Sequence, residues 1–238
     1  MRHAASLVRA LLVGALGLGV LGFGVARPAG AQVGHDPVSS PYEDLRGRQA
    51  ATIGIGTLAP GRDPAGVAPK SGVMLTGRYD LQLTRPLWFF ARLGVAPSLE
   101  RPIKDPLFTD AQRDAGTERH PMVLTEVGLN MNLTGNKSWR RVVPQFHSAI
   151  GFVTDGNTKF DLGGYKFGSA FTISYGLGAR VTTGRDWELH ADLTRVHWKY
   201  TYPDAYAAGS DPLVSSGRLG PWVGNSVMQI GVSRFFFR

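Results

Sequence analysis

The sequence predicts an all-β protein, an eight-stranded antiparallel up-and-down β-barrel, on three observations. Apolar and polar residues alternate with a period of two over most of the chain, which is the pattern of a strand with one apolar face. Short and long connections between these segments alternate strictly, as in a meander with one smooth end and one looped end. Glycine is abundant, at 31 of 238 residues, and charged residues make up only 18%. This composition is too rich in glycine for a helical bundle and too apolar for a disordered chain.

The clearest strand pattern covers Val73–Thr84, where six apolar or small residues alternate with polar ones or Met74. Seven further segments follow the same pattern: Gln49–Leu58, Leu87–Pro97, Val123–Leu133, Val142–Val153, Phe171–Thr182, Trp187–Thr194 and Trp222–Phe237. Three connections are short, Arg85–Pro86, Thr134–Arg141 and Thr183–Asp186, and four are long, Ala59–Gly72, Ser98–Pro121, Thr154–Lys166 and Thr201–Pro221. Glycine and asparagine beside charged residues suit tight turns at the short connections.

Residues 1–31 are predicted to be a signal peptide that exports the protein. Arg2, His3 and Arg9 precede an apolar run, Leu11–Val25, and the segment ends in an A-x-A pattern at Ala29–Ala31. The run is shorter than the roughly 20 apolar residues of a transmembrane helix. Removing the segment takes three arginines away and lowers the formal net charge from +8 to +5. The remaining basic residues are interleaved with acidic ones, so we expect no binding of nucleic acid.

Two domain-level expectations follow for the exported chain. Residues 32–47 show no periodicity and are predicted to be a flexible N-terminal leader, and residues 48–238 are predicted to form the barrel. The chain has no cysteine, which excludes disulfides, thiolate metal sites and cysteine nucleophiles.

Alternation alone does not say which way the apolar face points. It points inward in a lipocalin-like carrier and outward, to lipid, in a membrane barrel. Strands of about 10–14 residues match the roughly 9–11 residues that cross the hydrocarbon. Aromatic residues lie near both ends of the apolar face, at Phe89, Trp187 and Phe235–Phe237 near the short turns and at Phe152, Phe171 and Trp222 towards the long loops. We therefore expect a transmembrane barrel with short periplasmic turns and long external loops.

Residues 48–237 resemble the outer-membrane β-barrel domain family, whose small members include the transmembrane domains of outer-membrane proteins A, X and W. The resemblance rests on the eight-strand pattern and on a last strand, Val227–Phe237, that reaches the C-terminus. In that family the barrel-assembly machinery recognises a terminal aromatic strand, and this chain departs from the pattern by ending in Arg238. The resemblance implies a monomer in the outer membrane of a Gram-negative cell envelope, with membrane lipid and the assembly machinery as partners. It implies no cofactor and no metal.

Polar residues on the inward face are expected to meet in the lower and middle lumen. Three arginines face four carboxylates and two imidazoles in this set: Arg78, Asp80, Arg92, Glu126, His147, Arg180, Glu188, His190 and Asp192. The interior of eight strands is only wide enough for side chains, and buried charges have to be paired. We expect a mutually paired plug, with a proton-linked or gated path as the alternative.

The upper lumen carries small or apolar residues on the same face. They are Met74, Thr76, Gly94, Ala96, Met122, Leu124, Val196 and Trp198. One hypothesis is a shallow pocket, open to the exterior, for a small apolar ligand, as in the outer-membrane protein W group; five of these residues, Met74, Thr76, Leu124, Val196 and Trp198, would line it. The other is ordinary packing at the barrel mouth.

The expected function is therefore structural, surface contact through residues 98–121 and 201–221, or binding of a small apolar ligand, and not a wide pore. A lipid-modifying enzyme is the first alternative, because barrel lipid A 3-O-deacylases resemble this chain in size and topology. Those enzymes carry a His and a Ser two residues apart on one strand. Here His147 and Ser148 are adjacent and point to opposite faces, so no catalytic residue is predicted. His190 and His197 are seven apart and are likewise poor joint metal ligands. A periplasmic lipocalin-like carrier is the second alternative.

Overall fold

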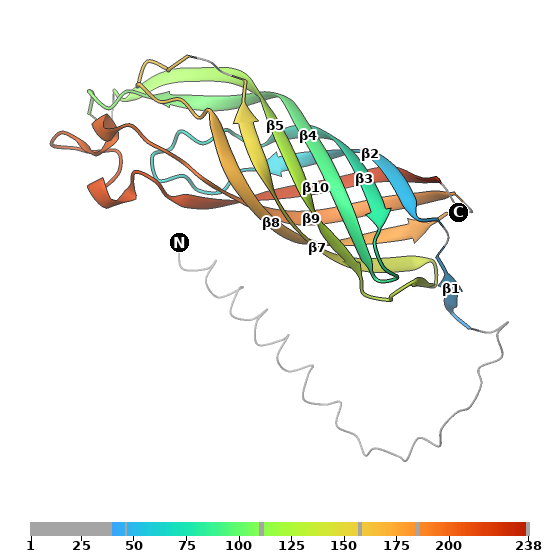
Figure 1. The fold of residues 1–238 in the computed structure, drawn as a ribbon. Helices are drawn as coiled ribbons and strands as arrows, with labels where there is room; N and C mark the ends of the chain where they lie inside the picture. The colour runs from blue at the N-terminus through green and yellow to red at the C-terminus, as the bar shows by residue number, and fades with distance from the viewer. Residues whose placement is uncertain (1–39, 46, 110–111, 157–158, 184–185, 237–238) are drawn as a thin grey trace, which may run out of the picture. The chain divides into compact units, whose positions relative to one another are not determined.

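Eight long antiparallel strands form a closed barrel (Figure 1). They are β2 (Gln49–Ala59), β3 (Gly72–Gln82), β4 (Leu87–Lys104), β5 (Asp114–Asn132), β7 (Val142–Asp155), β8 (Ser169–Thr182), β9 (Trp187–Lys199) and β10 (Trp222–Phe236). Each long strand pairs with the next one along the chain, and β10 pairs with β2 over eleven residues, which closes the barrel. The eight predicted strands and their up-and-down order are confirmed.

The computed structural model describes residues 40–236, except for 46, 110–111, 157–158 and 184–185. Pro41 to Arg238 form one compact unit. The predicted signal peptide and residues 32–39 of the predicted leader lie outside the described residues.

The two faces of each strand differ in burial as the alternation predicts. On β9, Trp187, Leu189 and Leu193 are about half exposed, whereas Glu188 and Asp192 are buried. The same division holds around the barrel, so its apolar face points outward and its polar face points inward. This is the reverse of the arrangement that a lipocalin-like carrier requires.

The β4–β5 hairpin is longer than the sequence pattern predicts. The pattern predicts a loop over Ser98–Pro121, but β4 continues to Lys104 and β5 begins at Asp114. A bulge between Ala96 and Leu99 shifts the pairing register. Because the bulge reverses the parity of the inward positions, the alternation in the sequence is interrupted there.

Two short strands, β1 (Tyr42–Asp44) and β6 (Lys137–Trp139), pair with each other at the short-turn end. β1 lies within the predicted leader and β6 lies within the predicted turn Thr134–Arg141. Three residues are too few for a period of two to be recognised. Arg140 and Arg141 have φ angles of 48° and 69° and reverse the chain between β6 and β7.

The long connection from β9 to β10 contains two short 3-10 helices, η1 (Asp204–Ala207) and η2 (Ser216–Arg218). Within the described ranges, no helix has both the length and the apolar character needed to cross a membrane.

Candidate functional site

Asp192 of β9 is the centre of a buried charge network in the middle of the barrel. Its carboxylate accepts a hydrogen bond of 2.8 Å from the Gln229 side-chain amide and lies 3.2 Å from Nε2 of His190. Across the lumen, it lies 3.6 Å from Nη1 of Arg78 and 3.8 Å from Nδ1 of His147. One carboxylate of β9 therefore contacts side chains of β3, β7 and β10.

Arg78 is held by both charge and aromatic contact. Its Nη2 donates to Oδ1 of Asp80 at 2.7 Å, and its guanidinium lies 4.1 Å from the ring centroid of Phe90. The fully buried ring of Phe90 also meets the imidazole of His147 edge-on, at 5.9 Å between centroids. Phe90 thus packs against two members of the network at once, which fixes their side-chain positions.

A second ion pair, Arg92 with Glu126, joins the network through a hydroxyl group. Nε of Arg92 donates to Oε2 of Glu126 at 2.9 Å, and Nη1 donates to the Thr194 hydroxyl at 3.2 Å. The same hydroxyl lies 3.0 Å from Nε2 of His147. Thr194 therefore connects the Arg92–Glu126 pair to Asp192 by way of His147.

Arg180 and Glu188 form a separate pair nearer the short turns. Nε of Arg180 lies 3.5 Å from Oε2 of Glu188. Oε1 of Glu188 accepts a hydrogen bond of 3.2 Å from the Thr182 hydroxyl. The Arg180 guanidinium lies 4.9 Å from the ring of Trp88 and donates to the side-chain oxygen of Asn132 at 3.2 Å. This end of the lumen is filled as well.

All nine residues predicted for the plug lie inside the barrel, and their exposed fractions are 0–5%. Seven belong to the network around Asp192 and two form the Arg180–Glu188 pair. Charge pairing is thus close to complete in this part of the interior, as a structural plug requires. The arrangement binds the strands to one another across the lumen.

Two glycines of β8 make room for the network. A Cβ atom at Gly176 would lie 2.7 Å from Nε2 of His147, and one at Gly178 would collide with the Asp192 carboxylate. These glycines are the register partners of His147 and Asp192 on the neighbouring strands. The high glycine content therefore has a local reason here: the interior is too narrow for two side chains at these levels.

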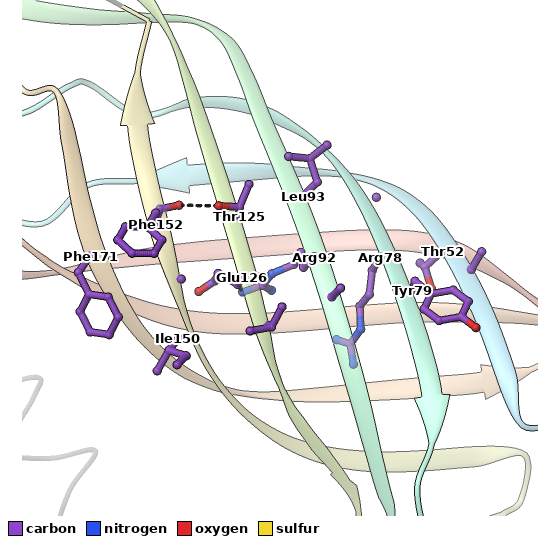
Figure 2. A pocket seen from close by; sticks show the side chains of 15 residues that line it. Thr52, Arg78, Tyr79, Arg92, Leu93, Thr125, Glu126, Ile150, Phe152 and Phe171 are labelled. Carbon is purple, nitrogen blue, oxygen red and sulfur yellow. Dashed lines mark hydrogen bonds and ion pairs between the residues drawn. The ribbon is translucent and has the colours of Figure 1, made fainter.

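On the outside, the wall is apolar at the level of this network. Figure 2 shows Arg92 and Glu126 next to each other on adjacent strands, with Phe152 and Phe171 on the two strands that follow. The two phenylalanine rings meet at 5.7 Å between centroids. The pocket in Figure 2 has a volume of about 680 Å³ and includes small residues such as Gly77. Large apolar side chains around small ones thus give the barrel an uneven apolar surface.

The residues of the predicted upper pocket are together, and most of them are buried. Met74, Leu124, Val196 and Trp198 are 0–4% exposed, and Thr76 is partly buried. The four buried residues belong to an apolar cluster that continues into residues of the external loops. A pocket beside this cluster, at Met122, has a volume of about 10 Å³, which holds no more than about one water molecule. This arrangement favours ordinary packing over an open ligand pocket.

Four tyrosines of the external loops belong to the same apolar cluster. Tyr165, Tyr202 and Tyr206 meet pairwise with ring centroids 5.9–6.1 Å apart, and Tyr200 stacks on Tyr202 at 6.0 Å. Burial raises the pKa of the Tyr165, Tyr200 and Tyr206 hydroxyls above the ordinary value. The pKa of Tyr202 is raised by burial and by its hydrogen bond to Asp63.

Asp63 fastens the β2–β3 loop over the same cluster. Its carboxylate accepts hydrogen bonds from the backbone N–H groups of Ala65, Val67 and Ala68 at 3.1, 2.5 and 2.7 Å, as well as from the Tyr202 hydroxyl. A single side chain thus holds one loop in a turn and joins it to another.

The β4–β5 hairpin ties the other external loops together by ion pairs. Arg101 of β4 pairs with Glu118 of β5 and with Asp161 of the β7–β8 loop. Arg113, just before β5, lies 3.0 Å from the carboxylate of Asp211 in the β9–β10 loop. We call this assembly of hairpin and loops the external cap.

Several interior residues are absent from the set predicted from the sequence. Trp88, Phe90, Asn132, Thr194 and Gln229 are all buried in contact with the predicted residues. Parity within a strand is the signal that could have found four of them, because each lies an even number of residues from a predicted member on the same strand. Gln229 lies on β10, which holds no predicted member.

The prediction that Phe235–Phe237 all lie on the outer face is wrong for Phe235, which points into the barrel. Its ring lies 6.3 Å from that of Trp88, and the Arg180 guanidinium lies 5.8 Å from it, both inside the barrel. Phe236 points outward and is 40% exposed. Adjacent residues of a strand face opposite sides, so an aromatic pair cannot share a face.

The protein is thus a closed eight-stranded barrel with an apolar outer wall and a charged, filled interior. This fold is that of small outer-membrane proteins. The chain is similar to the outer-membrane protein OprG from Pseudomonas aeruginosa, with a TM-score of 0.51 and 11% identity over 84% of this chain and 100% of that one. It is also similar to Escherichia coli outer-membrane protein W, with a TM-score of 0.47 and 14% identity over 81% of this chain and 99% of that one. No protein-family model and no curated protein matches the sequence at a significant level.

Proposed function

We propose that the protein is an integral outer-membrane β-barrel that is exported by its signal peptide and is inserted as a monomer. The observation that carries the proposal is the direction of the two faces. Outward side chains such as Ile53, Leu193 and Ile230 are 53–76% exposed, whereas the charged side chains of the interior are paired and buried. In water this wall would be a large apolar surface, but in lipid it is solvated, and a closed barrel leaves no unpaired strand edge.

Heat-modifiability in the membrane fraction tests this proposal. The exported protein is run on SDS gels, boiled and unboiled, after separation of the membrane pellet from the soluble periplasmic extract. A faster unboiled band from the pellet is expected, because a closed barrel resists SDS until it is heated. Identical mobilities, with the protein in the soluble extract, would contradict membrane insertion.

We propose further that the barrel conducts no solutes and catalyses no reaction. The paired network fills the middle of the lumen and the apolar cluster fills its external end, which supports a barrel without a pore. Ser148 is exposed on the outer wall and His147 is fully buried inside, which supports the absence of a serine–histidine pair on β7. Planar bilayers that contain the protein are expected to show no stepwise conductance at low voltage. Regular steps in the wild type would contradict a closed interior.

The external cap supports a role in surface contact. Leu107 and Phe108 of the β4–β5 loop are 87% and 50% exposed, and Phe160 and Leu162 of the β7–β8 loop are 72% and 78% exposed. Apolar side chains held outward on a rigid support are typical of a contact surface. The loops would thus act by contact with another surface while the barrel anchors them.

Attachment of cells to one another and to an apolar solid surface tests this role. Cells that carry the Leu107→Ser, Phe108→Ser, Phe160→Ser and Leu162→Ser variant are compared with wild type at equal surface abundance. Attachment is expected to decrease several-fold. The control is Gln112→Ala, which changes an exposed polar residue of the same loop. Equal attachment of all three strains would contradict the contact role and leave the membrane barrel untouched.

A further inference from the structure

Two positions of the outer wall within the described barrel strands carry a basic side chain between its two aromatic ends, and both lie on β9. Arg195 and His197 point outward near the external end of the strand, followed by Lys199 at the level of the aromatic residue Trp222. In the eight described barrel strands, no other Lys, Arg or His points outward between the level of Trp187 and the level of Trp222. A charged side chain that faces lipid is destabilising unless it reaches the interface or a counter-charge.

The Arg195 side chain runs towards the external end of the barrel. Its Nη1 donates to the Ser226 hydroxyl at 2.8 Å, and a Cβ atom at Gly224 would lie 2.7 Å from its Nε. Gly224 is the register partner of His197, whose Cε1 would lie 2.8 Å from the same Cβ. The guanidinium therefore lies over a glycine, beside the imidazole, in a space that another residue would fill.

His197 and Lys199 continue the basic surface upward. The imidazole of His197 stacks on the ring of Tyr175 at 5.6 Å and 21°. Lys199 leans over Gly220, where a Cβ atom would lie 3.1 Å from its Nζ. Within the described part of the chain, no carboxylate lies within ion-pair distance of Arg195 or Lys199. These cations thus contrast with the interior arginines, each of which has a carboxylate partner.

An apolar groove of about 900 Å³ lies on the same wall, closer to the short turns. It crosses β8, β9, β10, β2 and β3, and small residues such as Ala179, Ala191 and Gly231 line it. Ala191 is four residues from Arg195 along β9, a distance of about 13 Å along the strand. A lipid with its headgroup at Arg195 would reach the groove with its acyl chain.

We propose that Arg195, His197, Lys199 and Ser226 bind the phosphate of an anionic lipid headgroup in the external leaflet, with an acyl chain in the groove below. The inference rests on the proposed membrane insertion. A phosphate has only acceptor oxygens and suits the guanidinium, ammonium and hydroxyl donors of this site. The lipid supplies the counter-charge that the chain itself does not supply, and it is held on one side of the barrel only.

Quenching of Trp222 by brominated lipids tests the site directly. The test protein carries Trp139→Phe and Trp187→Phe, which leaves Trp222 as the outward-facing tryptophan among the described residues, since Trp88 and Trp198 are buried. It is folded into vesicles that mix phosphatidylcholine with phosphatidylglycerol, and bromine is placed on one lipid or the other near the headgroup. We expect phosphatidylglycerol to be enriched at Trp222 by about fivefold per cation relative to its bulk fraction.

Three variants separate the site from the general charge of the protein. Arg195→Gln with Lys199→Gln is expected to abolish the enrichment. Gly224→Val keeps every charge but displaces the Arg195 guanidinium, so it is expected to reduce the enrichment several-fold. Arg234→Gln removes an outward arginine at the opposite end of the barrel and is expected to leave the enrichment unchanged. The heat-modifiable band shows that each variant is folded.

The outcomes distinguish this inference from the proposed function. No quenching by either brominated lipid would mean that Trp222 is not in a membrane and would overturn both. Quenching without a preference for phosphatidylglycerol, or a preference that survives in the double variant, would overturn the lipid site alone. Inorganic phosphate is added against chloride at equal ionic strength, and the enrichment is expected to persist. If the enrichment of phosphatidylglycerol were lost in phosphate but not in chloride, the site would bind free phosphate, and the proposal of a lipid would be overturned.

Discussion

Arg92 and Glu126 are register partners on β4 and β5, and both are 3% exposed with Nε and Oε2 2.9 Å apart. In a barrel interior that has little room for water, each of these two buried charges is compensated by the other. The pair also contacts β9 through Thr194. Its energetic role therefore differs from that of an ion pair on the protein surface.

We predict that removal of either partner of this pair strongly destabilises the barrel. Arg92→Met leaves Glu126 buried without its partner, and Glu126→Leu does the same to Arg92, so each is expected to lower the free energy of unfolding by about 3–5 kcal/mol. The double variant is expected to lose much less than the sum, because it leaves neither charge behind. Urea unfolding in lipid vesicles, followed by tryptophan fluorescence, measures the three values. Arg119→Gln, in an exposed ion pair with Glu100, is the control and is expected to shift the midpoint little. Additive losses in the double variant would contradict the pairing.

A second prediction concerns the narrow level of the lumen at Gly178. Gly178→Val places side-chain atoms against the Asp192 carboxylate and is expected to prevent closure of the barrel or to lower its stability by several kcal/mol. Gly217→Ala, where nothing lies within 4 Å of the added Cβ, is expected to be neutral. The fraction of heat-modifiable protein after refolding reports the difference. Equal folding yields for the two variants would mean that the lumen has room that the structure does not show.

A third prediction follows from the raised pKa values of the tyrosines in the external cap. In the folded protein, Tyr165, Tyr200, Tyr202 and Tyr206 are expected to stay neutral above pH 10, where the tyrosines of the unfolded chain ionise. Their contribution to stability is fully present below about pH 10 and is lost as the pH rises towards their folded pKa values. A spectrophotometric titration near 295 nm is expected to show a late component from four of the seven tyrosines. Titration of all seven in one early step would contradict the burial of the cap.

A fourth prediction concerns the loop that Asp63 holds. Asp63→Asn weakens three backbone hydrogen bonds and the contact with Tyr202, and the change is expected to cost about 1–3 kcal/mol locally. Trypsin is then expected to cleave at Arg62 or Lys70 in intact vesicles, while the barrel keeps its heat-modifiable band. Asp204→Asn changes an exposed carboxylate of η1 and serves as the control. Protection of Arg62 and Lys70 in the Asp63→Asn variant would contradict the role of Asp63.

The barrel could be predicted from the sequence because the pattern that forms each strand is local. Each strand needs only its own alternation, and the lengths of the connections set the order. The parity of a strand also places its inward residues, which is why the seven charged residues and two histidines of the predicted set are all found inside. The parity rule fails where the backbone departs from regular pairing, as at the bulge between Ala96 and Leu99, beyond which β4 continues.

The contacts themselves could not be predicted in this way. The meeting of Asp192 with Arg78 and His147 depends on which strands face each other across the lumen, and on the room that Gly176 and Gly178 leave. The external cap depends on pairs between loops distant in the sequence, such as Arg101 with Asp161. The sequence shows Arg195, His197 and Lys199 at alternate positions of β9. Only the structure shows that these basic residues point outward on an otherwise apolar wall.

The network around Asp192 has a consequence for the order of barrel assembly. Arg78 and Arg92 belong to the second and third barrel strands, but Asp192 and Thr194, which contact them across the lumen, belong to the seventh. A barrel that grows from its N-terminal end therefore keeps these contacts unmade until β9 is added. In that order of assembly the nascent interior would have to stay hydrated until then, and the last hairpin, β9–β10, would both close the sheet and expel the water from its centre.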